Sequence, residues 1–242
     1  DLSQAEKQEY ANVISRLEAI CKKAHELGVK IYIDAEESWI QIAIDRLAEV
    51  MMQKYNGSSA IVYTTLQMYR HDRLEYLKTL IQKSAQNNFV LGVKIVRGAY
   101  LEKENNRAKE KHYPTPLQPT KKATDNDYNA AIKLIVEHIN TVELCAGTHN
   151  EKSAELLCEL MSEKKLPNNH ASVFFSQLFG MSDNISFNLA DKGYNVSKYL
   201  PYGPVKDTMP YLIRRAQENT SIAGQMGREL TLITSELKRR NK

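Results

Sequence analysis

The sequence predicts an α/β fold in which parallel strands and helices alternate around a barrel. β-rich runs and amphipathic helical runs alternate along the 242 residues, and strand starts recur at intervals of about 30 residues. No GxGxxG turn opens the first helix, which disfavours a doubly wound nucleotide-binding sheet. Polar and charged residues cluster where the strands end, as they do at the mouth of a barrel.

The first three elements follow from local patterns. Apolar residues recur at three- and four-residue steps over 6–27, which predicts an amphipathic helix, and Gly28 ends it. Residues 29–34 form a short β-rich run. Helical periodicity then continues to residue 55, where Asn56-Gly57 predicts a turn.

The same strand–helix unit repeats along the rest of the chain. Further strands are predicted over 60–65, 90–97, 142–147, 171–175 and 195–199, and helices over 70–86, up to 137, over 151–163 and over 205–219. The longest interval, with Pro114, Pro116 and Pro119, predicts an inserted loop. A (βα)8 barrel needs eight strands, so two more are expected upstream of Asp1. Residues 1–242 are expected to form a single barrel domain.

Composition excludes several classes of function. The net charge of +4 comes from 33 basic and 29 acidic side chains spread along the chain, so nucleic-acid binding is not indicated. The basic run 238–242 is read as a solvated helix end, with acidic lipid headgroups as the alternative partner. The three cysteines form no CxxC motif and indicate neither a disulfide framework nor a zinc site. The sequence has neither a membrane-spanning stretch nor a signal peptide pattern.

Strand ends supply the candidate site, because a barrel brings them to one mouth. They carry, in order, Asp34, Thr64 to Gln67, Lys94 with Arg97 and Gly98, Thr148-His149-Asn150, Gln177, and Lys198 with Tyr199. Such a set suits a polar ligand with anionic and amide groups. For any single residue, simple solvation at the end of a strand is the alternative explanation.

The predicted last helix carries a second candidate feature. Tyr211, Arg214, Arg215 and Glu218 are spaced i, i+3, i+4 and i+7, which places them on one helical face. Two arginines can hold a carboxylate by fork-like hydrogen bonds, and Glu218 can orient one of them. A solvent-exposed face with internal ion pairs is the alternative.

The strand around Lys94 suggests a cofactor. Two inward cations, Lys94 and Arg97, would be costly on a core strand without an anion or a polar cofactor, and a flavin ring is suitable. Gly98 would let the backbone approach such a group closely. His149 has no second ligand at metal-binding spacing, so no metal is predicted. No GxSxG turn is present, so serine hydrolase chemistry is not indicated.

Several ordered motifs together resemble the FAD-dependent proline dehydrogenase family, in particular its eukaryotic-type branch. The motifs are Ile33-Asp34-Ala35-Glu36, Lys94-Ile95-Val96-Arg97-Gly98-Ala99-Tyr100, Thr148-His149-Asn150, and Tyr199 through Arg214-Arg215-Ala216-Gln217-Glu218-Asn219. The resemblance implies a distorted (βα)8 barrel of TIM type, with FAD at the strand ends and the helix over 205–219 closing on the substrate.

The implied reaction is hydride transfer from C5 of L-proline to N5 of FAD, which gives Δ1-pyrroline-5-carboxylate. Electrons would then pass to ubiquinone or menaquinone, with peripheral association at a membrane. The implied location is the bacterial cytoplasm beside the inner membrane or the matrix side of the inner mitochondrial membrane.

The resemblance also implies a role for each matching residue. The catalytic residues would be Asp34, Lys94 and Tyr199. The substrate would contact Leu178, Tyr211, Arg214, Arg215 and Glu218. FAD would contact Ala35, Thr64, Gln67, Arg97, Gly98, Ala99, Thr148, His149 and Asn150.

Two positions depart from the pattern of many bacterial members, which carry Arg where this chain has Lys94 and Gln where it has Thr64. The family also places a substrate-contacting lysine on an earlier strand, which is expected upstream of this chain. Two alternatives stay open: a hydroxyproline dehydrogenase, which the bulk of Tyr199 disfavours, and a non-catalytic barrel that binds no flavin.

Overall fold

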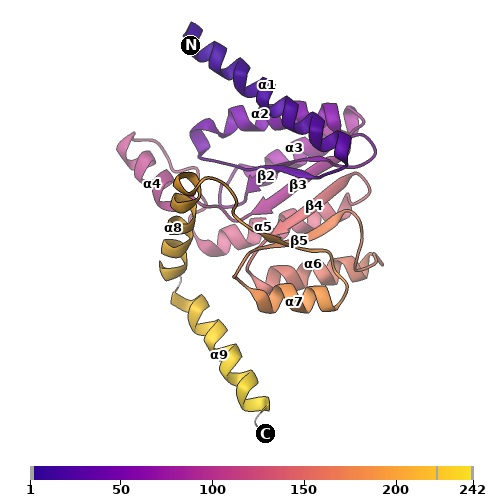
Figure 1. Ribbon diagram of the computed structural model, residues 1–242, viewed down its shortest axis with the longest axis vertical. Coiled ribbons are helices and arrows are strands. Elements are labelled where there is room, and N and C mark those ends of the chain that lie inside the picture. The colour runs from indigo at the N-terminus through magenta and orange to yellow at the C-terminus, as the bar shows by residue number, and fades with distance from the viewer. Residues whose placement is uncertain (1–2, 222, 241–242) are drawn as a thin grey trace.

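Six parallel strands form one curled sheet in the computed structural model, which describes residues 3–221 and 223–240 (Figure 1). The side chains of 214–229 and 232 lie outside this description. The strands are β1 Ile31–Ile33, β2 Val62–Gln67, β3 Leu91–Val96, β4 Val142–Gly147, β5 Val173–Leu178 and β6 Val196–Tyr199. Their order in the sheet is their order in the chain, so each strand pairs with the preceding one. The predicted parallel α/β fold is confirmed as a half-barrel.

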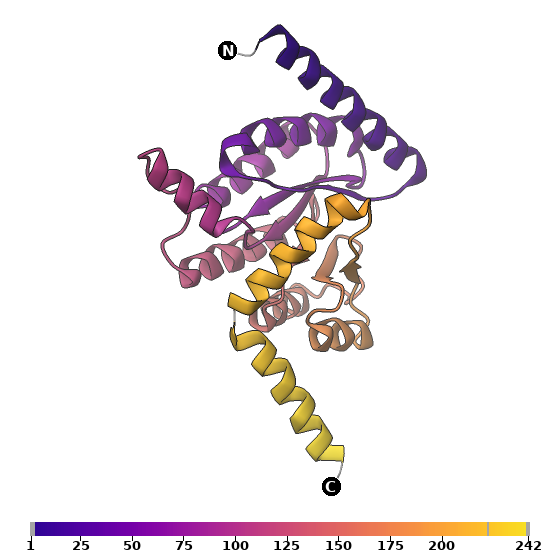
Figure 2. The same ribbon diagram turned by 60° about the vertical axis from the view of Figure 1, so that its left-hand side comes forward.

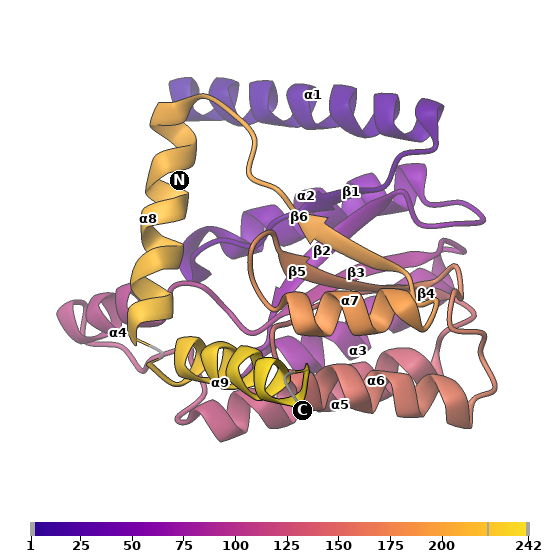
Figure 3. The same ribbon diagram turned by 60° about the horizontal axis from the view of Figure 1, so that its bottom comes forward.

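Helices cover the outer face of the sheet and its carboxyl end. They are α1 Gln4–Leu27, α2 Ser38–Tyr55, α3 Arg73–Gln86, α4 Leu101–Glu110, α5 Lys121–Glu137, α6 Glu151–Glu163, α7 Asp183–Asp191, α8 Val205–Ser221 and α9 Ala223–Arg240. Helix α8 lies across the side on which the strands end (Figure 3), and α9 extends away from the sheet (Figure 2). Among the described residues, none of the helices combines the length and the apolarity needed to span a bilayer.

Alternation along the strands separates a core face from a barrel face. On β2, Val62 and Leu66 are fully buried in the core cluster between sheet and helices. Tyr63 pairs with Gly92 of β3, and Gly92 pairs with Glu143 of β4, so these three residues face the inside of the curl. A methyl group on Gly92 would lie 2.8 Å from the Tyr63 ring, so only glycine fits beside it.

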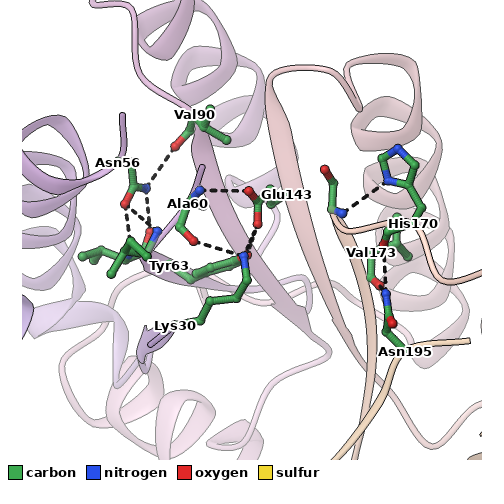
Figure 4. A network of polar contacts seen from close by, with 12 residues as sticks. Lys30, Asn56, Ala60, Tyr63, Val90, Glu143, His170, Val173 and Asn195 are labelled. Carbon is green, nitrogen blue, oxygen red and sulfur yellow. Dashed lines mark hydrogen bonds and ion pairs between the residues drawn. The ribbon is translucent and has the colours of Figure 1, made fainter. Parts of the chain in front are cut away.

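Asn56 fixes the passage from α2 into β2 (Figure 4). Its side-chain amide donates to the carbonyl oxygens of Val62 (2.8 Å) and Val90 (3.0 Å). Its side-chain oxygen accepts from the backbone nitrogens of Ile61 (3.0 Å) and Val62 (2.8 Å). One buried side chain therefore satisfies four backbone groups at the start of the strand.

An ion pair occupies the opposite end of the curl from the strand ends (Figure 4). Lys30, just before β1, pairs with Glu143 of β4, and its ammonium also donates to the Tyr63 hydroxyl at 2.8 Å. Glu143 accepts from the Tyr63 hydroxyl at 2.5 Å and from the backbone nitrogen of Ala60 at 2.9 Å. These contacts join β1, β2 and β4 across the inside of the sheet.

The inserted loop folds back on the loop after β2. The backbone nitrogen of Gln118 donates to the carbonyl oxygen of Tyr69 at 2.6 Å, and His71 donates to that of Pro116 at 3.1 Å. This proline-rich segment is thus an ordered connection between α4 and α5, as its composition indicated.

Candidate active site

A cavity of about 940 Å³ lies at the carboxyl ends of the strands. It brings together most of the residues that the sequence pointed to: Asp34, Ala35, Gln67, Lys94, Arg97, Gly98, Ala99, Thr148, His149, Asn150, Leu178, Tyr199 and Tyr211. They come from six strand ends and from α8. The convergence expected of a barrel mouth is therefore present even though the sheet is open.

Thr64 is the predicted residue that the described structure does not bring to the cavity. It is 1% exposed and has the same parity on β2 as the core residues Val62 and Leu66, whereas its neighbours Thr65 and Gln67 line the cavity. This place on the core face of β2 disagrees with the prediction that Thr64 contacts FAD. Gln67 is the cavity-lining glutamine of β2.

The side chains of Arg214, Arg215 and Glu218 lie outside the described residues, so the carboxylate clamp stays a prediction. The backbone of this segment is helical, within α8. One turn earlier, the Tyr211 ring meets the Tyr199 ring edge-on, with centroids 5.7 Å apart and an interplanar angle of 65°. The helix and the last strand are thus joined at the cavity.

Lys94 stands on the inner side of β3 between two partners. Its ammonium pairs with the carboxylate of Asp34 and lies 5.4 Å from the centroid of the Tyr32 ring. The Lys94 side chain is 17% exposed and that of Asp34 is 57% exposed. The cation is therefore compensated by a carboxylate that itself reaches the open part of the cavity.

Arg97 turns away from Lys94, toward α5. Its Nε donates to Asp125 Oδ1 at 2.6 Å, and its guanidinium lies 4.4 Å from the centroid of the Tyr128 ring. Burial would raise the pKa of Asp125, but hydrogen bonds from Lys121 and Arg97 outweigh it, and the pKa is lowered. Of the two kinds of compensation expected for these cations, an anion or a polar cofactor, the described residues supply the anions, Asp34 for Lys94 and Asp125 for Arg97.

Two glutamines at strand ends hold the cavity loops in place. Gln67 donates to the carbonyl oxygen of Glu36 (2.8 Å) and accepts from the backbone nitrogen of Ala99 (3.0 Å). Gln177 donates to the carbonyl oxygen of Thr148 (3.2 Å) and accepts from Ser186 Oγ (2.9 Å). Both amides therefore fix backbone around the cavity.

Gly98 allows the backbone after β3 to pack closely against the ring of Tyr69. Its φ is +139°, and a Cβ there would lie 2.4 Å from the Tyr69 ring. The glycine is required by the backbone turn after β3 and by the packing of Tyr69, whatever binds in the cavity.

Sequence reasoning missed part of the lining, including Tyr32, Cys145 and Ser176. Burial raises the pKa values of the Tyr32 hydroxyl and the Cys145 thiol, so both stay protonated at neutral pH. Alternation was the available signal, because Tyr32 lies two residues before Asp34 and shares its side of the strand.

Parallel strands with a charged cavity at their carboxyl ends define an α/β-barrel protein of the kind that binds small polar ligands there. The family model described as proline dehydrogenase matches residues 2–228. The chain belongs to the proline dehydrogenase family.

Curated relatives agree with this assignment. A mitochondrial proline dehydrogenase 1 of Drosophila melanogaster is 37% identical over 245 residues, covering 97% of this chain and 36% of the relative. A hydroxyproline dehydrogenase of Xenopus laevis is 36% identical over 243 residues, covering 99% of this chain and 52% of the relative. The chain thus spans about a third to a half of the length of these relatives.

A solved structure agrees on the fold. The proline utilization A protein of Bdellovibrio bacteriovorus, inactivated by N-propargylglycine, superposes with a TM-score of 0.82 at 23% identity. The match covers 89% of this chain and 22% of that protein.

Proposed function

We propose that the protein carrying this sequence oxidises L-proline to Δ1-pyrroline-5-carboxylate, with FAD as the hydride acceptor. The observation that supports this most strongly is the single cavity in which the family-like motifs of β1, β3, β4 and β6 converge. We further propose that residues 1–242 act as one barrel domain.

The cavity residues fit FAD in size and chemistry. The cavity volume of about 940 Å³ is at the upper end of the range for ligand pockets, as a dinucleotide requires. Lys121, the first residue of α5, and Lys152, in the first turn of α6, line it. Asn150 caps α6 by accepting from the Ser153 nitrogen at 3.2 Å. Cations and a helix start at one edge suit the two phosphates.

When bound, FAD would supply the hydride acceptor, while this chain would bind and orient the amino acid. Arg214 and Arg215 would hold the carboxylate, supported by Glu218. Tyr199, Tyr211 and Leu178 would form the apolar wall against the pyrrolidine ring and exclude water from it. Asp34 and Lys94 would place their ion pair beside the pyrrolidine ring of the substrate.

The electron acceptor and the location belong to the same proposal. The family resemblance supports a quinone acceptor, ubiquinone or menaquinone, and peripheral contact with the membrane that contains it. The fly relative is named as mitochondrial, which supports the mitochondrial one of the two expected locations.

The visible spectrum of the full-length protein tests the proposal. A flavin band at about 450 nm should be present and should bleach on anaerobic addition of proline. Protein that stays colourless after FAD is added would instead support the non-catalytic barrel. Bleaching by hydroxyproline and not by proline would favour the activity for which the frog relative is named.

Substitution of the arginine pair tests the clamp. Arg214→Met and Arg215→Met should each raise KM for proline by roughly 30- to 900-fold, equivalent to ~2–4 kcal/mol for a lost charged contact. The flavin absorbance should persist. Arg16→Met, on the exposed face of α1, is the matched control and should leave KM unchanged. Loss of flavin together with proline binding would make the pair structural.

A further inference from the structure

The guanidinium of Arg97 is held on several sides by protein groups. Besides the bond from Nε to Asp125, Nη1 donates to Thr148 Oγ1 at 2.7 Å and Nη2 donates to Ser153 Oγ at 2.9 Å. Its central carbon lies 4.4 Å from the centroid of the Tyr128 ring. The partners come from α5, from α6 and from the loop between β4 and α6, so the side chain joins three segments.

We propose that Asp125 is a positioning residue, which holds Arg97 and through it fixes the loop Thr148-His149-Asn150 at the wall of the cavity. The inference rests on the proposed function, in which that loop contacts FAD. A guanidinium is a rigid planar group, so a carboxylate on one edge sets the direction of the donors on the other. Asp125 therefore determines where Arg97 presents Nη1 to Thr148.

Thr148 connects Arg97 to the rest of the loop. Its Oγ1 accepts from Arg97 and also from the backbone nitrogen of Asn150 at 3.0 Å. Asn150 in turn caps α6 through the nitrogen of Ser153. A displaced Arg97 would therefore loosen Thr148, then the Asn150 amide, then the first turn of the helix.

Two of the Arg97 partners do not line the cavity, so they can distinguish an indirect effect on the cavity from direct contact with its ligand. Ser153 is 1% exposed and Tyr128 is 0% exposed, and neither lines the cavity. Asp125 does line it. A change at Ser153 thus acts on the cavity through Arg97, through α6 or through Asn129, to which the Ser153 hydroxyl donates at 2.8 Å. A matching effect at Asp125 would point to Arg97, the partner that the two residues share.

The test compares Asp125→Asn with Asp127→Asn in the full-length protein. Asp127 lies on the same helix, accepts from Gln118 Nε2 at 2.5 Å and does not line the cavity. Asp125→Asn should weaken FAD binding, measured by fluorescence titration, by about tenfold, because a charge-assisted hydrogen bond is lost. Asp127→Asn should leave the affinity unchanged.

A second readout needs no cofactor. In the FAD-free protein, amide hydrogen exchange over residues 148–150 should become about tenfold faster in Asp125→Asn and in Ser153→Ala, while exchange in β4 stays at the wild-type rate. Ser153→Ala also serves if Asp125→Asn fails to fold. Because this measurement is made without flavin, it remains decisive if the wild-type protein binds none and the proposed function fails.

Three outcomes would overturn the inference. The first is unchanged exchange over residues 148–150 in Asp125→Asn and Ser153→Ala. The second is unchanged FAD affinity in Asp125→Asn when the wild-type protein binds FAD. The third is an equal effect in Asp127→Asn, which would indicate a general loss of stability of α5.

Discussion

At Gly98 the backbone conformation and the neighbouring Tyr69 ring disfavour any residue with a Cβ. Gly98→Ala should lower the free energy of unfolding by about 2–4 kcal/mol, because the added methyl group meets the Tyr69 ring at a φ that other residues rarely adopt. Urea denaturation measures the change.

Gly57→Ala is the matched control for this prediction. A Cβ at Gly57 meets nothing within 4 Å, and the residue lies in an exposed turn. Its substitution should change the unfolding free energy by no more than about 1 kcal/mol. Equal effects at the two glycines would contradict the steric argument.

Tyr199 is the residue that should set the choice between proline and hydroxyproline. Tyr199→Ser should shift the ratio of kcat/KM values toward hydroxyproline, because the bulk of the ring crowds a substituent on the substrate. Steady-state kinetics with both amino acids measures the ratio. Tyr32→Ser, on the cavity wall at β1, is the control and should leave the ratio unchanged. An unchanged ratio in Tyr199→Ser would remove the argument.

Position at a strand end explains which site residues could be predicted. Motif and position identified Asp34, Lys94 and Gln67, which do line the cavity. The carboxylate partner of Arg97 could not be found this way, because Asp125 lies 28 residues later on a helix. Such a pairing depends on how α5 packs against β3, and local pattern carries no information about that.

At the scale of elements, the link between α2 and β2 depends on one side chain. Asn56→Ala should lower the free energy of unfolding by about 3 kcal/mol or more, because four backbone groups lose their partner in a buried place. Thermal and urea denaturation measure it.

Asn87 offers the control for Asn56. It follows α3 as Asn56 follows α2, but its side chain is exposed and donates to the carbonyl oxygen of Lys83. Asn87→Ala should cost less than about 1 kcal/mol. A loss as large as that of Asn56→Ala would show that helix capping alone accounts for both.

Helices and strands were both placed to within a few residues, and the strand predicted over 142–147 coincides with β4. The predicted helix over 151–163 matches α6 and that over 6–27 nearly matches α1, since amphipathic periodicity and Gly28 define their limits. The strand predicted over 171–175 is instead β5, Val173–Leu178. Its extension through Ser176 and Gln177 follows from pairing with β6, a tertiary effect that polar residues conceal in the sequence.

At the scale of the whole molecule, the pair Lys30–Glu143 should couple distant strands. Lys30→Met, Glu143→Gln and the double variant form a thermodynamic cycle. Breaking the pair should cost about 3 kcal/mol, since a partly buried charge is left without its partner. The double variant should be more stable than the sum of the single losses predicts by about 1–3 kcal/mol. Additive losses would mean that the ion pair contributes no coupling.

Acid should weaken the fold through carboxylates held by arginine. Burial would raise the pKa of Asp72, but hydrogen bonds from Arg73 and Arg70 outweigh it and hold the pKa below its usual range. A folded pKa below the unfolded value of about 3.9 stabilises the protein above that pH, and the contribution is lost as pH falls further.

The expected result is a decline in unfolding free energy from about pH 5 to pH 3, measured by urea denaturation. Asp72→Asn should show a shallower decline over the same range. An identical pH dependence in the variant would show that other carboxylates account for acid sensitivity.

The agreement between strand order and chain order has a consequence for synthesis. Each strand finds its neighbour one strand–helix unit back along the chain, so pairing can proceed while later sequence is still on the ribosome. Contacts between successive units keep the loops that must close short. The pair Lys30–Glu143 spans more of the chain and forms only after β4 has been made. Once β4 has been synthesised, Glu143 can bind Lys30 and Tyr63, and these contacts then join β1, β2 and β4 across the inner face of the sheet.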